Sequence, residues 1–122
     1  MGYRSDVKIV LARNDELAKR TEHYELWVSG EGAGSILKTL EEYFNVEEKD
    51  QEVDCSAKAR LKWNLEYPEV ASIVTYLDWL DSEDLGQHYQ FIRIGESFED
   101  VEYRGGLGTY WVDRVFAKAW SM

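Results

Sequence analysis

The stretch that comes closest to a chemical motif is Gly30-Glu31-Gly32-Ala33-Gly34-Ser35, which lies between a strand predicted at Tyr24–Ser29 and a helix predicted to begin at Ile36. Backbone N–H groups at the start of a helix can hold a phosphate, because the helix dipole and the free donors both favour an anion. The glycine spacing here is G-x-G-x-G rather than G-x-G-x-x-G, no lysine follows it, and Glu31 would repel phosphate. We therefore predict a loop in which Ser35 caps the helix, with a ligand held at Gly30–Ser35 as the alternative.

The other residue types that could do chemistry are not spaced for it. His23 and His88 lie far apart, neither has a second histidine at metal-ligand spacing, and the alternating aspartates of a calcium loop are absent. Cys55 is the only cysteine, which excludes a disulfide within the chain and a thiolate metal cluster. No serine lies in a G-x-S-x-G motif. The sequence thus predicts no cofactor, no metal and no catalytic residue, and we expect the protein not to be an enzyme.

Acidic residues dominate the charge of the chain, with 24 acidic against 14 basic residues and a net charge of -10. Charge of this sign repels phosphate backbones and anionic membranes, which disfavours direct nucleic-acid binding and favours a basic protein surface as partner. We predict that two acidic segments form the protein-binding surface; the alternative is that the acidity only keeps the protein soluble. The segments are Glu41, Glu42, Glu47, Glu48, Asp50 and Glu52, and then Asp78, Asp81, Glu83 and Asp84.

Trp79 is the aromatic residue predicted to anchor that surface. In a helix beginning at Pro68 it points about 180° away from the apolar stripe, by the ~100° step of an α-helix. A tryptophan in that position either packs beneath another element or marks a binding patch. Arg93 and Glu96, in the Arg-x-Gly-Glu sequence of a predicted hairpin, are expected to fix the turn, and a recognition role is the alternative.

The elements that must position these residues are a strand at Ala57–Leu65 and the helix that follows it. Every odd position of Ala57–Leu65 is apolar and every even position is polar or charged, which is the pattern of a strand with one buried face. Pro68 suits the first helical turn. An apolar stripe at helical spacing follows it, made of Val70, Ile73, Val74 and Leu77. A stripe that lies back on the strand predicts a two-layer sandwich.

The other predicted elements complete a single domain spanning residues 1–122. Strands are predicted at 7–12, 88–94, 99–104 and 110–116, a helix at 36–44, a short helical turn at 14–20 and an acidic loop at 47–54. The expected fold is α/β of the α+β type, with an antiparallel or mixed sheet of about five strands and two main helices on one face, close to a ferredoxin-like arrangement. No signal peptide or transmembrane run is visible, and together with the single cysteine this predicts a cytoplasmic protein without a membrane partner.

Three motifs stand out beyond these patterns: Gly2-Tyr3-Arg4-Ser5-Asp6-Val7, Lys62-Trp63 followed by Tyr67-Pro68-x-Val70, and Phe91-Ile92-Arg93-Ile94-Gly95-Glu96 followed by Asp100-Val101-Glu102. In this order they resemble a family of small proteins encoded by tailed bacteriophages and prophages. The resemblance does not cover the residues numbered in the 20s to 50s, and Asn64 occupies a position where an aromatic residue often follows the tryptophan. The family has no assigned activity, so the resemblance implies origin and fold rather than a mechanism.

The resemblance and the charge together predict a phage accessory protein that binds another protein. Such proteins often inhibit or redirect host or anti-phage defence proteins, and acidic ones sometimes imitate nucleic acid; this is an analogy at the level of the fold. One alternative is a small-ligand- or nucleotide-binding domain or small enzyme, with a pocket near Gly30–Ser35 or Arg93–Glu96. Another is a structural or assembly component of the phage. The high aromatic content is also compatible with a homo-oligomer.

Overall fold

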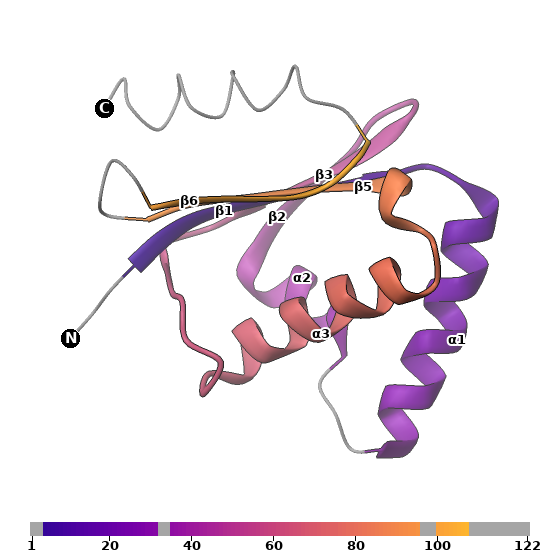
Figure 1. Cartoon of the computed structure of the whole chain (residues 1–122), viewed down its shortest axis with the longest axis horizontal. Helices are drawn as coiled ribbons and strands as arrows, with labels where there is room; N and C mark the ends of the chain where they lie inside the picture. The colour runs from indigo at the N-terminus through magenta and orange to yellow at the C-terminus, as the bar shows by residue number, and fades with distance from the viewer. Residues whose placement is uncertain (1–3, 32–34, 96–99, 108–122) are drawn as a thin grey trace.

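The computed structural model describes residues 4–31, 35–95 and 100–107 (Figure 1). Its elements, in chain order, are β1 (Arg4–Ala12), α1 (Asp15–Glu31), α2 (Ile36–Tyr43), β2 (Phe44–Glu48), β3 (Glu52–Ala57), β4 (Leu61–Lys62), α3 (Pro68–Ser82), the short 3-10 helix η1 (Gly86–His88), β5 (Tyr89–Ile94) and β6 (Val101–Gly105).

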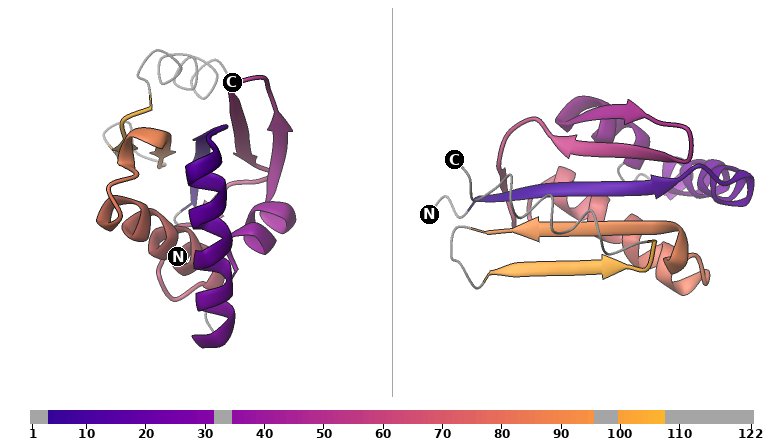
Figure 2. Two further views of the ribbon diagram at one scale, coloured as in Figure 1. Left: turned by 90° about the vertical axis from the view of Figure 1, so that its right-hand side faces the viewer. Right: turned by 90° about the horizontal axis from the view of Figure 1, so that it is seen from above.

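The strands of the described residues form one antiparallel sheet in the order β2-β3-β1-β5-β6, and the short β4 pairs with the start of β1. Helices α1, α2 and α3 all lie on one side of this sheet, and β2 and β6 are its two edges (Figures 1 and 2). Strands β1, β2, β3 and β5, with the helices between them, follow the β-α-β-β-α-β order of ferredoxin-like folds. The predicted two-layer α+β fold is therefore confirmed, with three helices where the sequence predicted two main ones.

The centre of the sheet is β1, whose run from Val7 to Ala12 is apolar on both faces apart from Lys8. Val7 and Ile9 face the helices, whereas Val10 belongs to a second, smaller cluster with Ile92 and Ile94 on the opposite face. A strand that is buried on both faces reads as a nearly continuous apolar run, because neither set of alternating side chains meets water. The strand predicted at 7–12 is confirmed, and it lies at the centre of the sheet.

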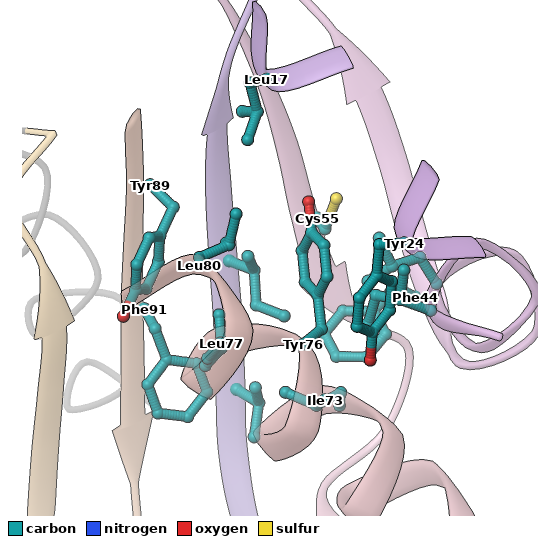
Figure 3. Close-up of a cluster of buried hydrophobic side chains, with 14 of the residues drawn as sticks. Leu17, Tyr24, Phe44, Cys55, Ile73, Tyr76, Leu77, Leu80, Tyr89 and Phe91 are labelled. Atoms are coloured by element: carbon teal, nitrogen blue, oxygen red, sulfur yellow. The ribbon is translucent and has the colours of Figure 1, made fainter. Parts of the chain in front are cut away.

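The main core lies between α3 and the sheet. Leu77 and Leu80 are fully buried, Ile73 is fully buried beside them, and all three point from α3 toward β1 and β5, where they meet Phe91 (Figure 3). Pro68 occupies the first turn of α3, where its missing N–H leaves no intrahelical bond unmade. The predicted helix after Pro68 is confirmed, and of its apolar stripe Val70, Ile73 and Leu77 are buried, whereas Val74 is only partly buried.

The segment 24–29, predicted as a strand, is instead part of the long helix α1. Leu17, Tyr24 and Val28 are the buried side chains of α1, and their spacing of seven and four residues places them on one helical face. Asn14 caps this helix by accepting a hydrogen bond from the Leu17 N–H at 3.1 Å. The alternation of Tyr24 with its neighbours suggested a strand because the window was too short to separate a period of two from one of 3.6.

Two further predictions between residues 44 and 65 are wrong. The predicted acidic loop at 47–54 is largely the hairpin of β2 and β3, and the predicted strand 57–65 shrinks to β4. Leu65, expected in the core, is 64% exposed, and Ala59 is also exposed. Two of the apolar positions of this segment are alanines, whose small side chains gain little from burial. Strand β1 pairs instead with β3 over most of its length, and β4 pairs only with its first residues. The strand predicted at 110–116 and Glu96 lie outside the described residues.

The contrast between Leu77 and Leu65 gives a direct test of this core. Leu77→Ala is expected to lower the free energy of unfolding by about 2–5 kcal/mol, because a fully buried leucine leaves a cavity when truncated. Leu65→Ala, a matched control, is expected to change it by less than about 0.5 kcal/mol. Urea denaturation measures both values, and similar losses for the two variants would contradict the described packing.

Candidate protein-binding groove

An apolar groove opens on the helix side of the sheet, between α1, α2 and the β2–β3 hairpin. One part of it, of about 680 Å³, lies between α1 and α2, and another, of about 580 Å³, lies between α2 and β2. The two parts share one set of lining residues, so they form one continuous surface depression, which we call the α2 groove. The shared lining consists of Leu11, Leu37, Leu40, Glu48 and Val53. Leu37 is 52% exposed, so an apolar side chain of the groove already faces solvent.

Carboxylates outnumber cations around the α2 groove. The acidic lining residues are Asp15, Glu22, Glu41, Glu48 and Asp50, and the basic ones are Arg13 and Lys58. All five carboxylates belong to exposed residues, and none forms a salt bridge within the described part of the chain. The groove is therefore apolar at its floor and negatively charged at its rim, which suits a ligand that is apolar and cationic.

Lys49, which lies beside the groove, does not neutralise this rim. Lys49 lies in the hairpin turn, and its ammonium pairs with Asp54 at 2.7 Å on the other face of the sheet. The hydrogen bond to Asp54 raises the pKa of Lys49. Arg13, in turn, donates a hydrogen bond to the backbone carbonyl of Lys49 at 2.9 Å, which holds the hairpin turn against the start of α1. Lys49 and Arg13 thus stabilise the hairpin. Lys58, which lines the groove, donates to the backbone carbonyl of Glu41 at 3.4 Å and forms no salt bridge with a carboxylate of the described residues.

The second predicted acidic segment is used within the fold. The Arg104 guanidinium of β6 bridges Asp78 at 2.8 Å and Asp81 at 2.7 Å on α3. Burial lowers the pKa of Arg104, but its hydrogen bonds with Asp81 and Asp78 outweigh this and raise it above its ordinary value. Glu83 pairs with Arg20 of α1. Asp84 is the exposed member of this segment without a salt bridge among the described residues.

Trp79 packs beneath α1 rather than standing free on the surface. Its ring is partly buried, 4.8 Å from the ring of Tyr24 and stacked at 5.9 Å on that of Tyr76. Of the two interpretations offered by the sequence, the structure matches packing under another element. The strongly exposed tryptophan of the described residues is Trp27, which is 56% exposed next to Leu26 on α1.

The start of α2 holds a carboxylate of the chain itself. Glu25 accepts hydrogen bonds from the Ser35 hydroxyl at 2.5 Å and from the N–H groups of Ile36 at 3.3 Å and Leu37 at 3.0 Å. Ser35 caps the helix as predicted, by accepting from the Lys38 N–H at 3.1 Å. The donors that a phosphate would use are therefore already taken, which favours the loop-and-cap interpretation of Gly30–Ser35; residues 32–34 lie outside the described part.

Arg93 fixes the β5–β6 hairpin. Its guanidinium donates to Asp100 at 2.8 and 3.1 Å, to Glu102 at 3.0 Å and to the Ser5 hydroxyl at 2.9 Å, and it lies 5.8 Å from the ring of Trp63. With its side chain only 13% exposed, the residue has little surface left for a ligand. The structure thus favours the turn-fixing role that the sequence indicated for Arg93.

The described residues contain no group of His, Cys, Asp and Glu side chains arranged to hold a metal ion. Cys55 is fully buried, and burial raises the pKa of its thiol to about 12, so it stays protonated and unreactive. Among the described helices, none has the length and apolar composition required to cross a membrane.

Sequence reasoning missed the apolar part of the groove. Leu37 belongs to the helix predicted at 36–44, whose apolar stripe was expected to be buried, and Val46, which is 48% exposed, lay between that helix and the loop predicted at 47–54. The signal that was present is the alternation of the apolar Phe44 and Val46 with the polar Asn45 and Glu47, followed by a turn at 49–51 and a second alternating run. That pattern is typical of a hairpin.

Comparisons with known proteins found no match: the chain matches no protein-family model, and no curated protein or solved structure is significantly similar to it.

The aromatic cluster under α1 predicts opposite effects for two tyrosine substitutions. The Tyr24 hydroxyl is buried without a hydrogen-bond partner in the described structure, so Tyr24→Phe is expected to keep the free energy of unfolding or raise it by about 1 kcal/mol. The Tyr76 hydroxyl shares a 2.8 Å hydrogen bond with that of Thr21, so Tyr76→Phe is expected to lower it by about 0.5–1.5 kcal/mol. Chemical denaturation at neutral pH compares them, and equal losses would contradict the assignment.

The same tyrosines predict a loss of stability in alkali. Burial, and then the nearby Glu25 charge, raise the pKa of Tyr24 to about 12; burial likewise raises the pKa of Tyr76 to about 12, from 10.0. The unfolded chain loses these protons at a lower pH than the folded chain does. The stability that the two protonated hydroxyls contribute is therefore complete below pH 10, and it is lost as the pH rises from 10 to 12. The double variant Tyr24→Phe/Tyr76→Phe should show a shallower decline of unfolding free energy over this range, and a decline as steep as that of the native chain would refute the assignment.

Proposed function

We propose that this protein acts by binding a basic segment of another protein in the α2 groove. The observation that carries the proposal is an exposed apolar floor bordered by carboxylates that have no salt-bridge partner among the described residues. Burial of apolar side chains would supply most of the affinity, because desolvated contacts dominate binding energy. The carboxylates would steer a cationic partner and exclude acidic ones.

Within the predicted surface, the two acidic segments have different roles in this proposal. Glu41, Glu48 and Asp50 border the groove and are available to a partner. Asp78 and Asp81 are held by Arg104, so their charges are largely neutralised before any partner arrives. The proposal therefore rests on the first segment, and Trp79 contributes by holding α1 in place rather than by touching the partner.

The partner we propose is a host or anti-phage defence protein with a basic surface, including one that normally holds nucleic acid. This part of the proposal rests on the sequence resemblance to small tailed-phage proteins and on the net charge of -10. A chain that occupied such a surface would inhibit or redirect its owner, since the charged groups that hold nucleic acid would be covered. The encounter would take place in the host cytoplasm.

The experiment compares two variants with the same change in net charge. Glu41→Lys/Glu48→Lys reverses charge at the groove, and Glu16→Lys/Glu66→Lys reverses it at exposed positions outside the groove lining. Each tagged chain is incubated with bacterial lysate at ionic strengths from about 0.05 M to about 1 M, since screening weakens exposed charge contacts. We expect a protein retained by the native chain and by the control pair, lost with the groove pair and released by salt.

Circular dichroism verifies that both variants are folded, and the retained protein is identified and titrated by calorimetry. Retention of nothing at low salt, or equal loss with the two pairs of substitutions, would contradict the proposal. Stabilisation of the chain by nucleotides or other small molecules in a thermal-shift screen, without protein retention, would support the ligand-binding alternative instead.

A further inference from the structure

The second part of the α2 groove borders an open sheet edge. Strand β2 is the last strand on its side of the sheet, so one of its edges has no neighbour among the described strands (Figure 2). An open edge presents backbone N–H and C=O groups that can pair with another strand.

The register shows which groups of β2 face outward. The Lys49 N–H donates to the Glu52 carbonyl at 2.8 Å and the Lys58 N–H donates to the Tyr43 carbonyl at 2.9 Å, which marks both pairs as hydrogen-bonded. Hydrogen-bonded and non-hydrogen-bonded pairs alternate along an antiparallel ladder. Asn45 and Glu47 therefore bond toward β3, whereas the N–H and C=O groups of Val46 and Glu48 point to the open edge.

The Phe44 N–H does not extend this edge, because it donates to the Leu40 carbonyl at the end of α2. The outward groups are thus concentrated at Val46 and Glu48, whose side chains also line the groove. A strand that paired here would place every second side chain beside Val46, over the groove, and the others beside Glu47 on the opposite face of the sheet.

Charge decides which strand can occupy this edge. A second copy of the chain would bring Glu47 and Glu48 of one molecule beside those of the other, and like charges directly opposite are destabilising. A strand with lysine or arginine beside these two residues would instead form cross-strand pairs of opposite charge. An apolar residue beside Val46 would cover its exposed side chain.

We propose that the partner binds by adding a strand to the open edge of β2, with an apolar side chain over the groove at Val46 and basic side chains beside Glu47 and Glu48. This mode of recognition rests on the proposed function and specifies it. Backbone hydrogen bonds to Val46 and Glu48 supply binding that does not depend on the partner's exact sequence, and the groove and the glutamates supply selectivity.

A pair of peptides tests the proposal on the native chain. The probe is a capped peptide of about seven residues in which every second residue is lysine and the remaining positions alternate valine and lysine, so that a paired strand can place valine beside Val46 and lysine beside Glu47 and Glu48. Its control has the same side chains and charges but carries N-methyl groups on alternate backbone nitrogens, which removes the donors of one edge. We expect the probe to bind at low salt at least about tenfold more tightly than its N-methylated form, because the outward hydrogen bonds are lost.

Hydrogen exchange and one protein variant locate the site. The amides of Val46 and Glu48 should become protected when the probe is added, and Val46→Pro should weaken probe binding, with Val46→Thr as the control that keeps the N–H and a β-branched side chain. Because Val46→Pro can also disturb the hairpin, the N-methylated peptide on the native chain gives the result that does not depend on it.

Each outcome decides between the proposals. Equal binding of the two peptides, weakened by Glu41→Lys/Glu48→Lys and without protection at Val46 and Glu48, would overturn strand addition while leaving the proposed function intact. Absence of binding by either peptide at low salt would overturn strand addition, and the proposed function would fall with it if the lysate comparison also failed. A dimer of the chain that Val46→Pro dissociates would make a second copy the occupant, which also overturns the proposal.

Discussion

The α2 groove depends on the contacts by which Tyr24 and Glu25 of α1 hold α3 and α2. Tyr24 packs against the rings of both Tyr76 and Trp79, with ring centroids 5.2 Å and 4.8 Å away, and the adjacent Glu25 binds the first N–H groups of α2. Two neighbouring residues of α1 therefore hold two different helices. Because one turn of α1 makes both sets of contacts, these side chains fix where α1 lies relative to α2 and α3. The groove exists because this turn is anchored while Leu37, just beyond it, is left without a cover.

The same architecture separates two acidic segments that the sequence presents as equivalent. On α3, the carboxylates face strand β6 and helix α1, which bring Arg104 and Arg20 to them from remote parts of the chain. At α2 and the hairpin, Lys49 is drawn to Asp54 on the other face of the sheet. Charge density along the chain therefore gives no measure of charge available to a partner, because what matters is which carboxylates the tertiary contacts leave unpaired.

Sequence patterns predicted well those elements whose pattern is long or whose first residue is typical of a helix start. Pro68 marks the start of a helix because only the first turn tolerates a missing N–H, and Ser35 marks another start because its hydroxyl can cap. The two-layer fold followed from these elements and from the apolar central strand. The alternation of Ala57–Leu65 was given more weight than its alanines justify, so the predicted organising strand proved to be mostly irregular.

What could not be predicted are the features that depend on contacts between distant segments. Trp79 lies opposite the stripe of α3 in any helical projection, and only the arrival of Tyr24 from α1 decides that it is covered. The groove likewise combines Leu11 of β1, Leu37 of α2 and Val53 of β3, none of which has a local signal for exposure or for a shared surface. Glu25 was expected to lie on a strand, and its role at α2 required the helix α1 that the short window concealed.

The acidic residues of β2 resolve a conflict that this fold creates. An open edge beside an apolar groove invites pairing with any exposed strand, including the same edge of another copy, and natural sheets protect such edges with charge. Glu47 and Glu48 give that protection against self-association, because pairing with a second copy would bring carboxylates of the two molecules beside one another. When a basic strand binds, the same two glutamates are stabilised, since each then gains a cross-strand partner of opposite charge. One pair of residues can thus keep the free protein apart from its copies and favour a cationic segment, which is why the edge and the groove are best understood as one surface.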